Sequence, residues 1–453
     1  MLNTGGRESH FLYLSGVVDR FGDIRTPPAA QSALDDVAEV ARREIVSLKA
    51  GTTLPLAVND KLAELEDLLN KVPQDRCATY HLPEALSRLD LAAQESNSSC
   101  VSKDVKTLVY AVITKLASAA TYNLENSPQL TVIGEGRSNW VLSDPEKKFV
   151  VIIPKVVSVE GFNNLKLRRW VGKLIHDLDQ PKIHRIATLP ILHGVGDFAQ
   201  GESISAIFKR SKDQKRISSE LTGAVQAVGK LMRQISAKQV ERYGRPRSTS
   251  EDKGRWHGAR EHLRHSQGKI YKTFLTDKKP EAIRAYMLNY DVISEELQDH
   301  LSTMAKKLFL SDPPPMLAHL DPHFGNFLYN AKTKQVTALD WDSATFTSEA
   351  RMLGRFYHFF SQYSEEDGKV RETLFRNFLS GYEQEPEKRE ALYKKAIYSA
   401  TIDFYAHLDY YIAKEKNAKG IEPSPESLPL LERTLVGRIK WTAKVMEGWQ
   451  EES

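Results

Sequence analysis

Apolar residues recur three or four residues apart in the first part of the chain, a spacing that places them on one face of a helix. The first such series consists of Leu34, Val37, Ala41, Ile45 and Leu48. A second series over residues 62–69 predicts another helix, which Asn59 or Asp60 can cap, and a third covers Val105 to Ala120. We therefore expect an N-terminal helical extension over residues 1–125. Its expected role is structural, and binding of a protein partner through these helices is the alternative.

The pattern changes near residue 126 to short runs typical of β-strands. Gln129–Ile133 is extended and mostly apolar, Gly134–Asn139 reads as a loop, and Trp140–Leu142 resumes a strand. A polar turn at Asp144–Lys148 precedes the β-rich run Phe149–Lys155. This part predicts a strand, a glycine loop, a strand, a turn and a strand that ends in a lysine.

Helical periodicity returns after residue 200 and is interrupted by a predicted hairpin. Phe327–Tyr329 and Val336–Leu339 are short apolar strands joined by the polar turn Asn330–Lys334. Such a hairpin brings Asn326 and Asp340 together at its open end. The helical segments are Leu221–Ile235, Pro280–Asn289, Ser294–Phe309, Met352–Tyr363, Val370–Tyr382 and Glu390–Lys416.

Length and composition add limits to this pattern. A chain of 453 residues exceeds what one core usually supports. We expect an α+β protein with regions 1–125, 126–200 and 201–453. The net charge of +4, from 63 basic and 59 acidic residues, does not call for a nucleic-acid partner. Cys77 and Cys100 are too few for a disulfide scaffold or a cysteine zinc site. No signal segment or apolar run of about 20 residues is present, so we expect no membrane partner and a reducing, cytoplasmic location.

The candidate chemistry lies between residues 319 and 342. The run from His319 to Asn326 reads HLDPHFGN, and Leu339-Asp340-Trp341-Asp342 follows. Asp321 can accept a proton from a reacting hydroxyl. The side-chain carbonyl oxygen of Asn326 and the Asp340 carboxylate can bind Mg²⁺. Single Asp and Asn residues in loops are usually turn formers. The joint pattern instead favours phosphoryl transfer from ATP, which needs mainly positioning and charge neutralisation.

The segment from His319 through Asp342 resembles the catalytic loop and metal-binding strand of the aminoglycoside phosphotransferase family, whose relatives include choline kinase. Family members carry a His-x-Asp-x-His-x-x-Asn run and an Ile-Asp-Trp-type motif, and this sequence departs only at Leu339. The resemblance implies a bilobal protein-kinase-like fold with a small β-rich N-lobe and a mainly helical C-lobe. It also implies ATP and Mg²⁺ as cofactors and a small-molecule acceptor.

The same resemblance implies roles for the residues of the loop. Asp321 would be the catalytic base, Asn326 and Asp340 would bind Mg²⁺, and His319 would support the loop backbone. His323 and Gly325 would shape the loop. Met352-Leu353 stands where family members commonly carry Asp-Leu, so the sequence does not identify the residue that supports this loop.

The resemblance assigns nucleotide contacts to the predicted strands. The turn with Gly134, Gly136, Ser138 and Asn139 would cover the phosphates, with Asn139 where a third glycine stands in related patterns. A structural hairpin turn is the alternative for two glycines at this spacing. Lys155 would contact the α- and β-phosphates, and a solvated strand end is its alternative.

Two further parts of a kinase are less well marked. The helix predicted over Gly161–Leu178 lacks a central glutamate to pair with Lys155, and only Glu160 and Asp177 are in reach. The stretch 192–201 resembles the segment that joins two kinase lobes, where backbone groups around Asp197 to Ala199 would meet the adenine edge.

A candidate acceptor site lies on a late helix. Asp403, His407, Tyr410 and Tyr411 fall near one face of it. Carboxylates and aromatic rings bind ammonium groups, so these residues predict a cationic or polyhydroxyl acceptor. Packing of the aromatic residues in a core is the alternative.

Two other functions use the same residues. A protein kinase shares this chemistry, but Asp340 is followed by Trp-Asp instead of Phe-Gly, and no Ala-Pro-Glu segment follows. A pseudokinase that acts as a binding scaffold is the other alternative. The presence of Asp321, Asn326 and Asp340 argues against a scaffold, and the missing helix glutamate argues for it.

Overall fold

The structure is a computed structural model of the chain. It describes residues 28–72, 76–121, 129–136, 138–156, 159–187, 192–213, 217–238, 244, 286–310, 314–361, 368–419, 428 and 430–451. The chain divides into two compact units. The first comprises residues 1–173 and 181–198, and the second comprises residues 174–180 and 199–453.

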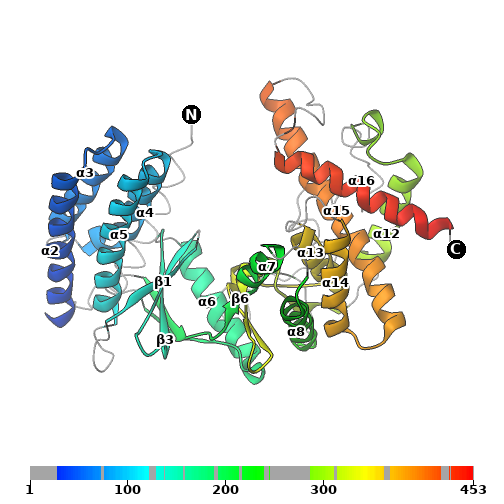
Figure 1. The fold of residues 1–453 in the computed structure, drawn as a ribbon, viewed down its shortest axis with the longest axis horizontal. Helices are drawn as coiled ribbons and strands as arrows, with labels where there is room; N and C mark the ends of the chain where they lie inside the picture. Colours follow the sequence, from blue (N-terminus) through cyan, green and yellow to red (C-terminus); the bar gives the residue numbers. More distant parts are fainter. Residues whose placement is uncertain are drawn as a thin grey trace. The chain divides into compact units, whose positions relative to one another are not determined.

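The first unit begins with four helices that pack against one another, as Figure 1 shows in blue and cyan. They are α2 (Pro28–Gly51), α3 (Leu56–Lys71), α4 (Arg76–Glu95) and α5 (Ser99–Ala120). The three predicted helices are confirmed by α2, α3 and α5, and α4 is an addition to them. The predicted cap of the second helix is wrong: α3 starts at Leu56 after Pro55, and the Asn59 side chain donates a hydrogen bond to the Leu54 carbonyl at 3.0 Å.

A five-stranded antiparallel sheet follows, in the order β1-β2-β3-β5-β4. Its strands are β1 (Thr131–Glu135), β2 (Asn139–Ser143), β3 (Phe149–Pro154), β4 (Ile183–Ala187) and β5 (His193–Asp197). The predicted strand–loop–strand–turn–strand order is confirmed. Asp144 closes the second turn because its carboxylate accepts hydrogen bonds from the Lys148 and Phe149 amides at 2.7 and 2.9 Å.

The N-terminal helices and the sheet share one hydrophobic core. Apolar residues of α2 to α5 and residues of the first strands, such as Trp140, Val151 and Ile153, form a single buried cluster. Helix α5 contacts both β1 and β2 (Figure 1). The helices are thus part of the same compact unit as the predicted nucleotide-binding strands. Helix α6 (Val159–Leu174) lies between β3 and β4 in the chain and ends before the short helix η1 (His176–Leu178).

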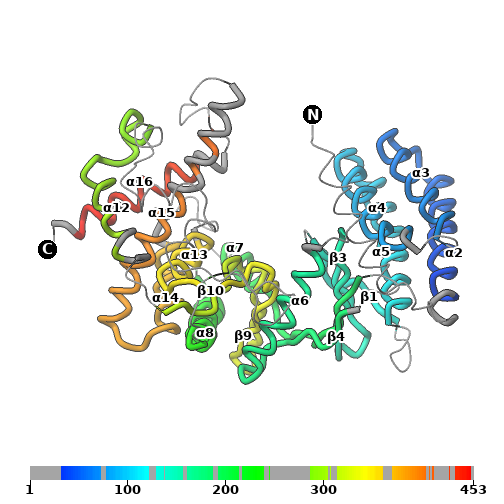
Figure 2. The backbone as a smooth tube through the Cα atoms, turned by 180° about the vertical axis from the view of Figure 1, so that it is seen from behind, coloured from blue at the N-terminus to red at the C-terminus, as the bar shows by residue number. Residues whose placement is uncertain are grey.

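The second unit is mainly helical and carries a two-stranded sheet, β10-β7, and a three-stranded sheet, β6-β8-β9. Helices α13 and α15 pack together, as do α8 and α14 (Figure 2). The helices are α7 (Ile204–Asp213), α8 (Ser219–Ser236), α12 (Glu295–Leu310), α13 (Glu349–Ser361), α14 (Gly368–Tyr382), α15 (Pro386–Lys419) and α16 (Leu430–Glu451). The strands are β6 (Glu202–Ser203), β7 (Met316–Ala318), β8 (Phe327–Asn330), β9 (Gln335–Ala338) and β10 (Thr345–Thr347).

The α+β class is confirmed by a β-rich first unit and a mainly helical second unit. Within the part of the chain that the structure describes, no helix combines the length and the apolar character needed to cross a bilayer.

Candidate active site

The predicted hairpin forms the base of the candidate site. Strands β8 and β9 pair in antiparallel register from Phe327 with Ala338 to Asn330 with Gln335. One further backbone hydrogen bond, from the Leu339 amide to the Asn326 carbonyl at 2.8 Å, extends this pairing by one step. Asn326 therefore lies opposite the residue that precedes Asp340, and the predicted hairpin geometry is confirmed.

His319 is completely buried behind the loop. Its Nε2 lies 2.7 Å from the Leu339 carbonyl oxygen, and its Nδ1 accepts a hydrogen bond from the Asp321 amide at 3.3 Å. Its ring packs on Phe327 and Trp341. Burial lowers the pKa of His319, and this outweighs the Leu339 carbonyl and the Asp340 and Asp321 charges, which act to raise it. A neutral ring with its proton on Nε2 satisfies both contacts.

Asn326 is buried and holds the backbone of Asp321. Its Nδ2 donates a hydrogen bond to the Asp321 carbonyl at 2.8 Å. Because this bond uses the amide nitrogen, it orients the Oδ1 atom as the remaining acceptor. The Asp321 side chain stays partly exposed at 37%, and the Nε2 atom of His323 is 3.8 Å from its carboxylate. His323 also shapes the loop, since its Nδ1 accepts from the Gly325 amide at 3.1 Å.

Asp340 sits at a strained backbone position. Its φ of 55° and ψ of 63° lie in the left-handed region, which favours glycine, Asn and Asp. The residue follows β9 and Leu339, and it directly precedes the short helix η3 (Trp341–Ser343) as its N-cap residue. A backbone conformation of this kind is retained where the surrounding contacts fix it, and it is common at functional sites.

The donor set at the open end of the hairpin fits Mg²⁺. The described residues contain no group of three or more His, Cys, Asp or Glu side chains that could hold a metal ion. Mg²⁺, however, usually takes one or two protein oxygens and completes its shell with water and phosphate oxygens. The Asn326 amide oxygen and the Asp340 carboxylate supply ligands of that number and type.

Two residues that the sequence did not indicate support the hairpin and the loop. Arg355 of α13 donates a hydrogen bond through Nε to the Leu320 carbonyl at 3.1 Å. Gln180 is buried and bonds both the Val336 carbonyl, at 3.1 Å, and the Ala338 amide, at 2.8 Å. Arg355 follows Met352-Leu353 by two residues, and this position was the available signal for the brace. For Gln180 the sequence holds no comparable signal.

The residues predicted to contact the phosphates lie together in the first unit. The turn between β1 and β2 is closed by a hydrogen bond from the Gly136 amide to the Asn139 carbonyl at 2.9 Å. The Lys155 amide donates to the Ser138 carbonyl at 2.8 Å, which joins the end of β3 to this turn. Gly134 is part of β1 and pairs with Val141. The structure thus brings Gly134, Gly136, Ser138, Asn139 and Lys155 to one end of the sheet.

The acidic partner of Lys155 differs from the two that the sequence suggested. Lys155 Nζ lies 2.7 Å from Glu135 Oε1, at the end of β1. Asp177 belongs to the second unit and bonds Lys238 at 2.7 Å. The side chain of Glu160 lies outside the described residues. In the sequence, the position of Glu135 between Gly134 and Gly136 was the feature that could have identified it as the partner of Lys155.

The remaining predicted positions are less informative. Asp197 ends β5, where its carboxylate accepts from the Lys182 amide at 3.0 Å and contacts His184 at 2.5 Å. The Asp197 amide donates to the Lys182 carbonyl at 3.0 Å. Asp403 is only 2% exposed within α15. The side chains of His407 and Tyr410 lie outside the described residues.

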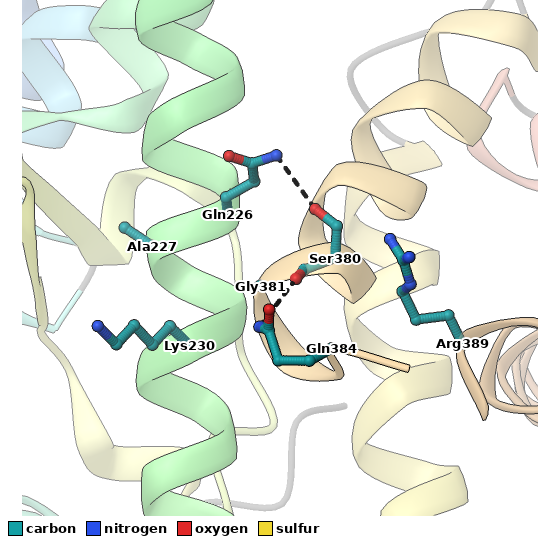
Figure 3. Close-up of a pocket in the computed structure, with 7 residues that line it drawn as sticks. All are labelled: Gln226, Ala227, Lys230, Ser380, Gly381, Gln384 and Arg389. Carbon is teal, nitrogen blue, oxygen red and sulfur yellow. Dashed lines mark hydrogen bonds between the residues drawn. The ribbon is translucent and has the colours of Figure 1, made fainter. Parts of the chain in front are cut away.

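A shallow pocket in the second unit is separate from the loop. Its volume is about 440 Å³, and it opens between α8 and α14 (Figure 3). The Gln226 amide bonds the Ser380 hydroxyl across it at 3.1 Å. No residue between 319 and 342 lines this pocket, so it does not belong to the candidate site. Its lining consists of Gln226, Ala227, Lys230, Ser380, Gly381, Gln384 and Arg389.

The chain matches no family model and no curated protein. Solved structures to which it is similar include an ethanolamine kinase from Plasmodium vivax, with 11% identity over 78% of this chain and 93% of that one and a TM-score of 0.42. A choline kinase from Streptococcus pneumoniae is 14% identical over 69% of this chain and 91% of that one, with a TM-score of 0.37.

A third solved structure is a GDP complex of an aminoglycoside 2′-phosphotransferase mutant. It is 15% identical over 73% of this chain and 99% of that one, with a TM-score of 0.42. All three are named as kinases or phosphotransferases.

Proposed function

We propose that the chain is an ATP-dependent phosphotransferase that moves the γ-phosphoryl group to a hydroxyl group of a small molecule. One observation carries the proposal. A single hydrogen-bonded hairpin end holds a partly exposed aspartate, Asp321, next to an amide and a carboxylate, Asn326 and Asp340. This is the minimal set for phosphoryl transfer: a base and a pair of oxygen ligands for Mg²⁺.

Asp321 is the proposed base. Its carboxylate accepts the proton of the acceptor hydroxyl while the acceptor oxygen bonds the γ-phosphorus and the bond from that phosphorus to the ADP oxygen breaks. His319 and Asn326 hold the Asp321 backbone through its amide and its carbonyl. A base that is fixed in this way keeps its geometry without reorganisation during the reaction.

Asn326 and Asp340 are the proposed Mg²⁺ ligands. The bound ion would neutralise phosphate charge. On the nucleotide side, we assign Gly134, Gly136, Ser138 and Asn139 to the phosphate-covering turn and Lys155 to the phosphates. Backbone groups from Asp197 to Ala199 are assigned to the adenine. Asn326 contributes in two ways, because its amide nitrogen holds the Asp321 backbone and its amide oxygen would be a ligand of the ion.

The proposed acceptor is a small cationic or polyhydroxyl molecule. The support for this class is the carboxylate of Asp403 on α15, together with the sequence positions of His407 and Tyr410 one and two turns further on. Substitution of Asp403 by Asn would raise the acceptor KM. Asp403 is buried, so packing in the core is the alternative role for it. An unchanged acceptor KM in this variant would exclude Asp403 from the acceptor site and leave the phosphotransferase proposal intact.

The test is ADP release from MgATP with pools of acceptors. The pools would contain aminoglycosides, choline-like amines, sugars and a generic protein substrate, with Asp321→Asn as the control. We expect one small-molecule pool to accelerate ADP release by the wild type and not by the variant. Release that occurs only with the protein pool would indicate a protein kinase. Failure of MgATP to bind the wild type would overturn the proposal.

A further inference from the structure

The ion pair of Lys155 is one part of a larger side-chain cluster in the first unit. Glu135 Oε1 contacts Lys155 at 2.7 Å. Its other oxygen, Oε2, accepts a hydrogen bond from the Tyr110 hydroxyl at 3.2 Å and lies 3.2 Å from Lys106 Nζ. Lys106 and Tyr110 are four residues apart on α5, so both project from one face of that helix. One carboxylate therefore joins the predicted phosphate-binding lysine to a helix of the N-terminal region.

The burial of these groups makes the cluster more than a surface ion pair. The side chains of Glu135 and Lys155 are 16% and 12% exposed, whereas that of Lys106 is 43% exposed. The Lys155 ammonium also lies 5.1 Å from the centre of the Trp140 ring. A charge that is largely removed from water needs fixed partners. Glu135 thus has one shielded partner, Lys155, and two supports from α5.

The charge states agree with this arrangement. Burial acts to raise the pKa of Glu135, but the hydrogen bonds and charges of Lys155 and Lys106 outweigh it and lower the pKa. Burial and the Glu135 charge both raise the pKa of the nearby Asp90 on α4, so Glu135 holds its proton less readily than Asp90 does. Glu135 is therefore ionised at neutral pH, as a partner of a lysine must be.

We propose that Glu135 is the positioning residue for Lys155, and that Lys106 and Tyr110 of α5 hold Glu135 in place, which makes the N-terminal helical region part of the nucleotide-binding machinery. In protein kinases a glutamate on a helix pairs with the equivalent lysine. Here the only acidic residue of α6 is Glu160, at its second position. The partner of Lys155 is instead Glu135, at the end of β1, the strand that leads into the phosphate-covering turn. Helix α5 of the N-terminal region holds Glu135 in place. This inference rests on the proposed function.

The experiment measures the dissociation constant of MgATP by calorimetry for a set of variants. Glu135→Gln keeps the shape and removes the charge, and we expect it to weaken MgATP binding by about tenfold, as loss of a charge-assisted contact would. Tyr110→Phe and Lys106→Met are expected to weaken it by about two- to fivefold each. Lys103→Met is the matched control, because Lys103 is an exposed lysine one turn earlier on α5, and it should bind MgATP as the wild type does.

Combined variants separate positioning from a general loss of structure. Since Lys106 and Tyr110 act through Glu135, adding Tyr110→Phe to Glu135→Gln should weaken binding no further. Glu135→Asp, which keeps the charge, should restore part of the affinity. The Tm values of the variants without nucleotide would confirm that they fold.

The outcomes also separate this inference from the proposed function. Wild-type MgATP affinity in folded Glu135→Gln, or an additive effect of Tyr110→Phe in that background, would overturn the role of Glu135 and leave the phosphotransferase proposal standing. Absence of MgATP binding by the wild type would overturn both. Weak binding by Glu135→Gln together with acceptor-dependent ADP release by the wild type would support both.

Discussion

In the second unit, backbone groups hold the loop around Asp321, whereas in the first unit side chains hold Lys155. Each hydrogen bond that fixes the loop has a main-chain atom as one partner: the Leu339 carbonyl for His319, the Asp321 carbonyl for Asn326 and the Leu320 carbonyl for Arg355. Lys155 instead depends on a side chain, Glu135, which two more side chains support.

This difference separates what a short motif can specify from what it cannot. Every residue provides a carbonyl and, except for proline, an amide. The polar side chains of a short motif can therefore fix a loop by hydrogen bonds to backbone carbonyls and amides, whatever residues supply them. A side-chain pair requires a particular residue at both ends, and the second residue can come from any element. We therefore expect the loop to be robust to changes at its backbone partners and Lys155 to be sensitive to each member of its cluster.

The largest expected effect is at the base. Asp321→Asn should lower kcat by about a hundred- to ten-thousandfold, because an amide cannot accept the hydroxyl proton. The MgATP dissociation constant should stay within about twofold of the wild type. Calorimetry and a steady-state assay with the identified acceptor measure the two quantities. The control is Asp342→Asn, which removes a nearby carboxylate that lies outside the proposed set. Equal losses in the two variants would contradict the role of Asp321.

The next effect is at Asp340. Asp340→Ala should weaken MgATP binding by about tenfold or more, because it removes a proposed Mg²⁺ ligand and puts alanine, which adopts the left-handed region less readily than aspartate, at a positive φ. Asp340→Asn keeps the left-handed backbone and one oxygen, and it isolates the charge. We expect intermediate affinity for this variant in a titration with MgATP. Unchanged affinity in both variants would exclude Asp340 as a ligand.

His319 should make stability depend on pH. Its pKa is lowered in the folded state, so the unfolded chain binds the proton more readily. Its contribution is complete above the unfolded pKa of about 6.5 and is lost as the pH falls toward the folded pKa, at no more than about 1.4 kcal/mol per pH unit. His319→Gln should cost about 1–3 kcal/mol at pH 8.

Chemical denaturation of the wild type and His319→Gln from pH 8 to pH 5 tests this expectation. The difference between their free energies of unfolding should shrink as the pH falls. A constant difference over that range would show that the His319 ring does not need to be neutral to hold the loop.

A smaller effect is expected at the brace from α13. Arg355→Met removes the hydrogen bond to the Leu320 carbonyl and keeps a long apolar side chain. Loss of this bond should lower the free energy of unfolding by about 1 kcal/mol and kcat by roughly three- to tenfold through misplacement of Asp321. The control is Arg376→Met, which removes an exposed ion pair with Glu372 and Glu390. If the two variants have the same kcat, Arg355 is not a brace of the loop.

The smallest effect is expected where a backbone atom makes the contact. Leu339→Ile leaves the carbonyl that His319 contacts. We expect stability within about 0.5 kcal/mol of the wild type, and kcat should stay within about twofold. A large loss of kcat in this variant would contradict the idea that backbone partners make the loop robust.

The loop and hairpin were predictable because their information is local. Short apolar runs define β8 and β9, and the polar turn between them sets which residues face each other, so the sequence brings Asn326 and Asp340 together. The glycine turn followed from the same kind of pattern. Helix α4 was not predicted from the sequence, although its apolar residues are buried with those of α3 and α5.

The supports of the site could not be predicted because they depend on tertiary packing. Gln180 reaches Val336 and Ala338 across more than 150 residues of chain. Glu135 was visible within the turn, but its pairing with Lys155 depends on the register of three strands and the position of α5. Residue type alone does not contain that information.

The most direct test of the account is the fate of the γ-phosphoryl group. Mass spectrometry of the products, with MgATP and the acceptor pool that accelerates ADP release, would count phosphate esters against ADP. We predict one phosphate ester of the acceptor for each ADP in the wild type and neither product above background in Asp321→Asn. ADP accompanied only by inorganic phosphate, or equal ester formation by Asp321→Asn, would contradict the account.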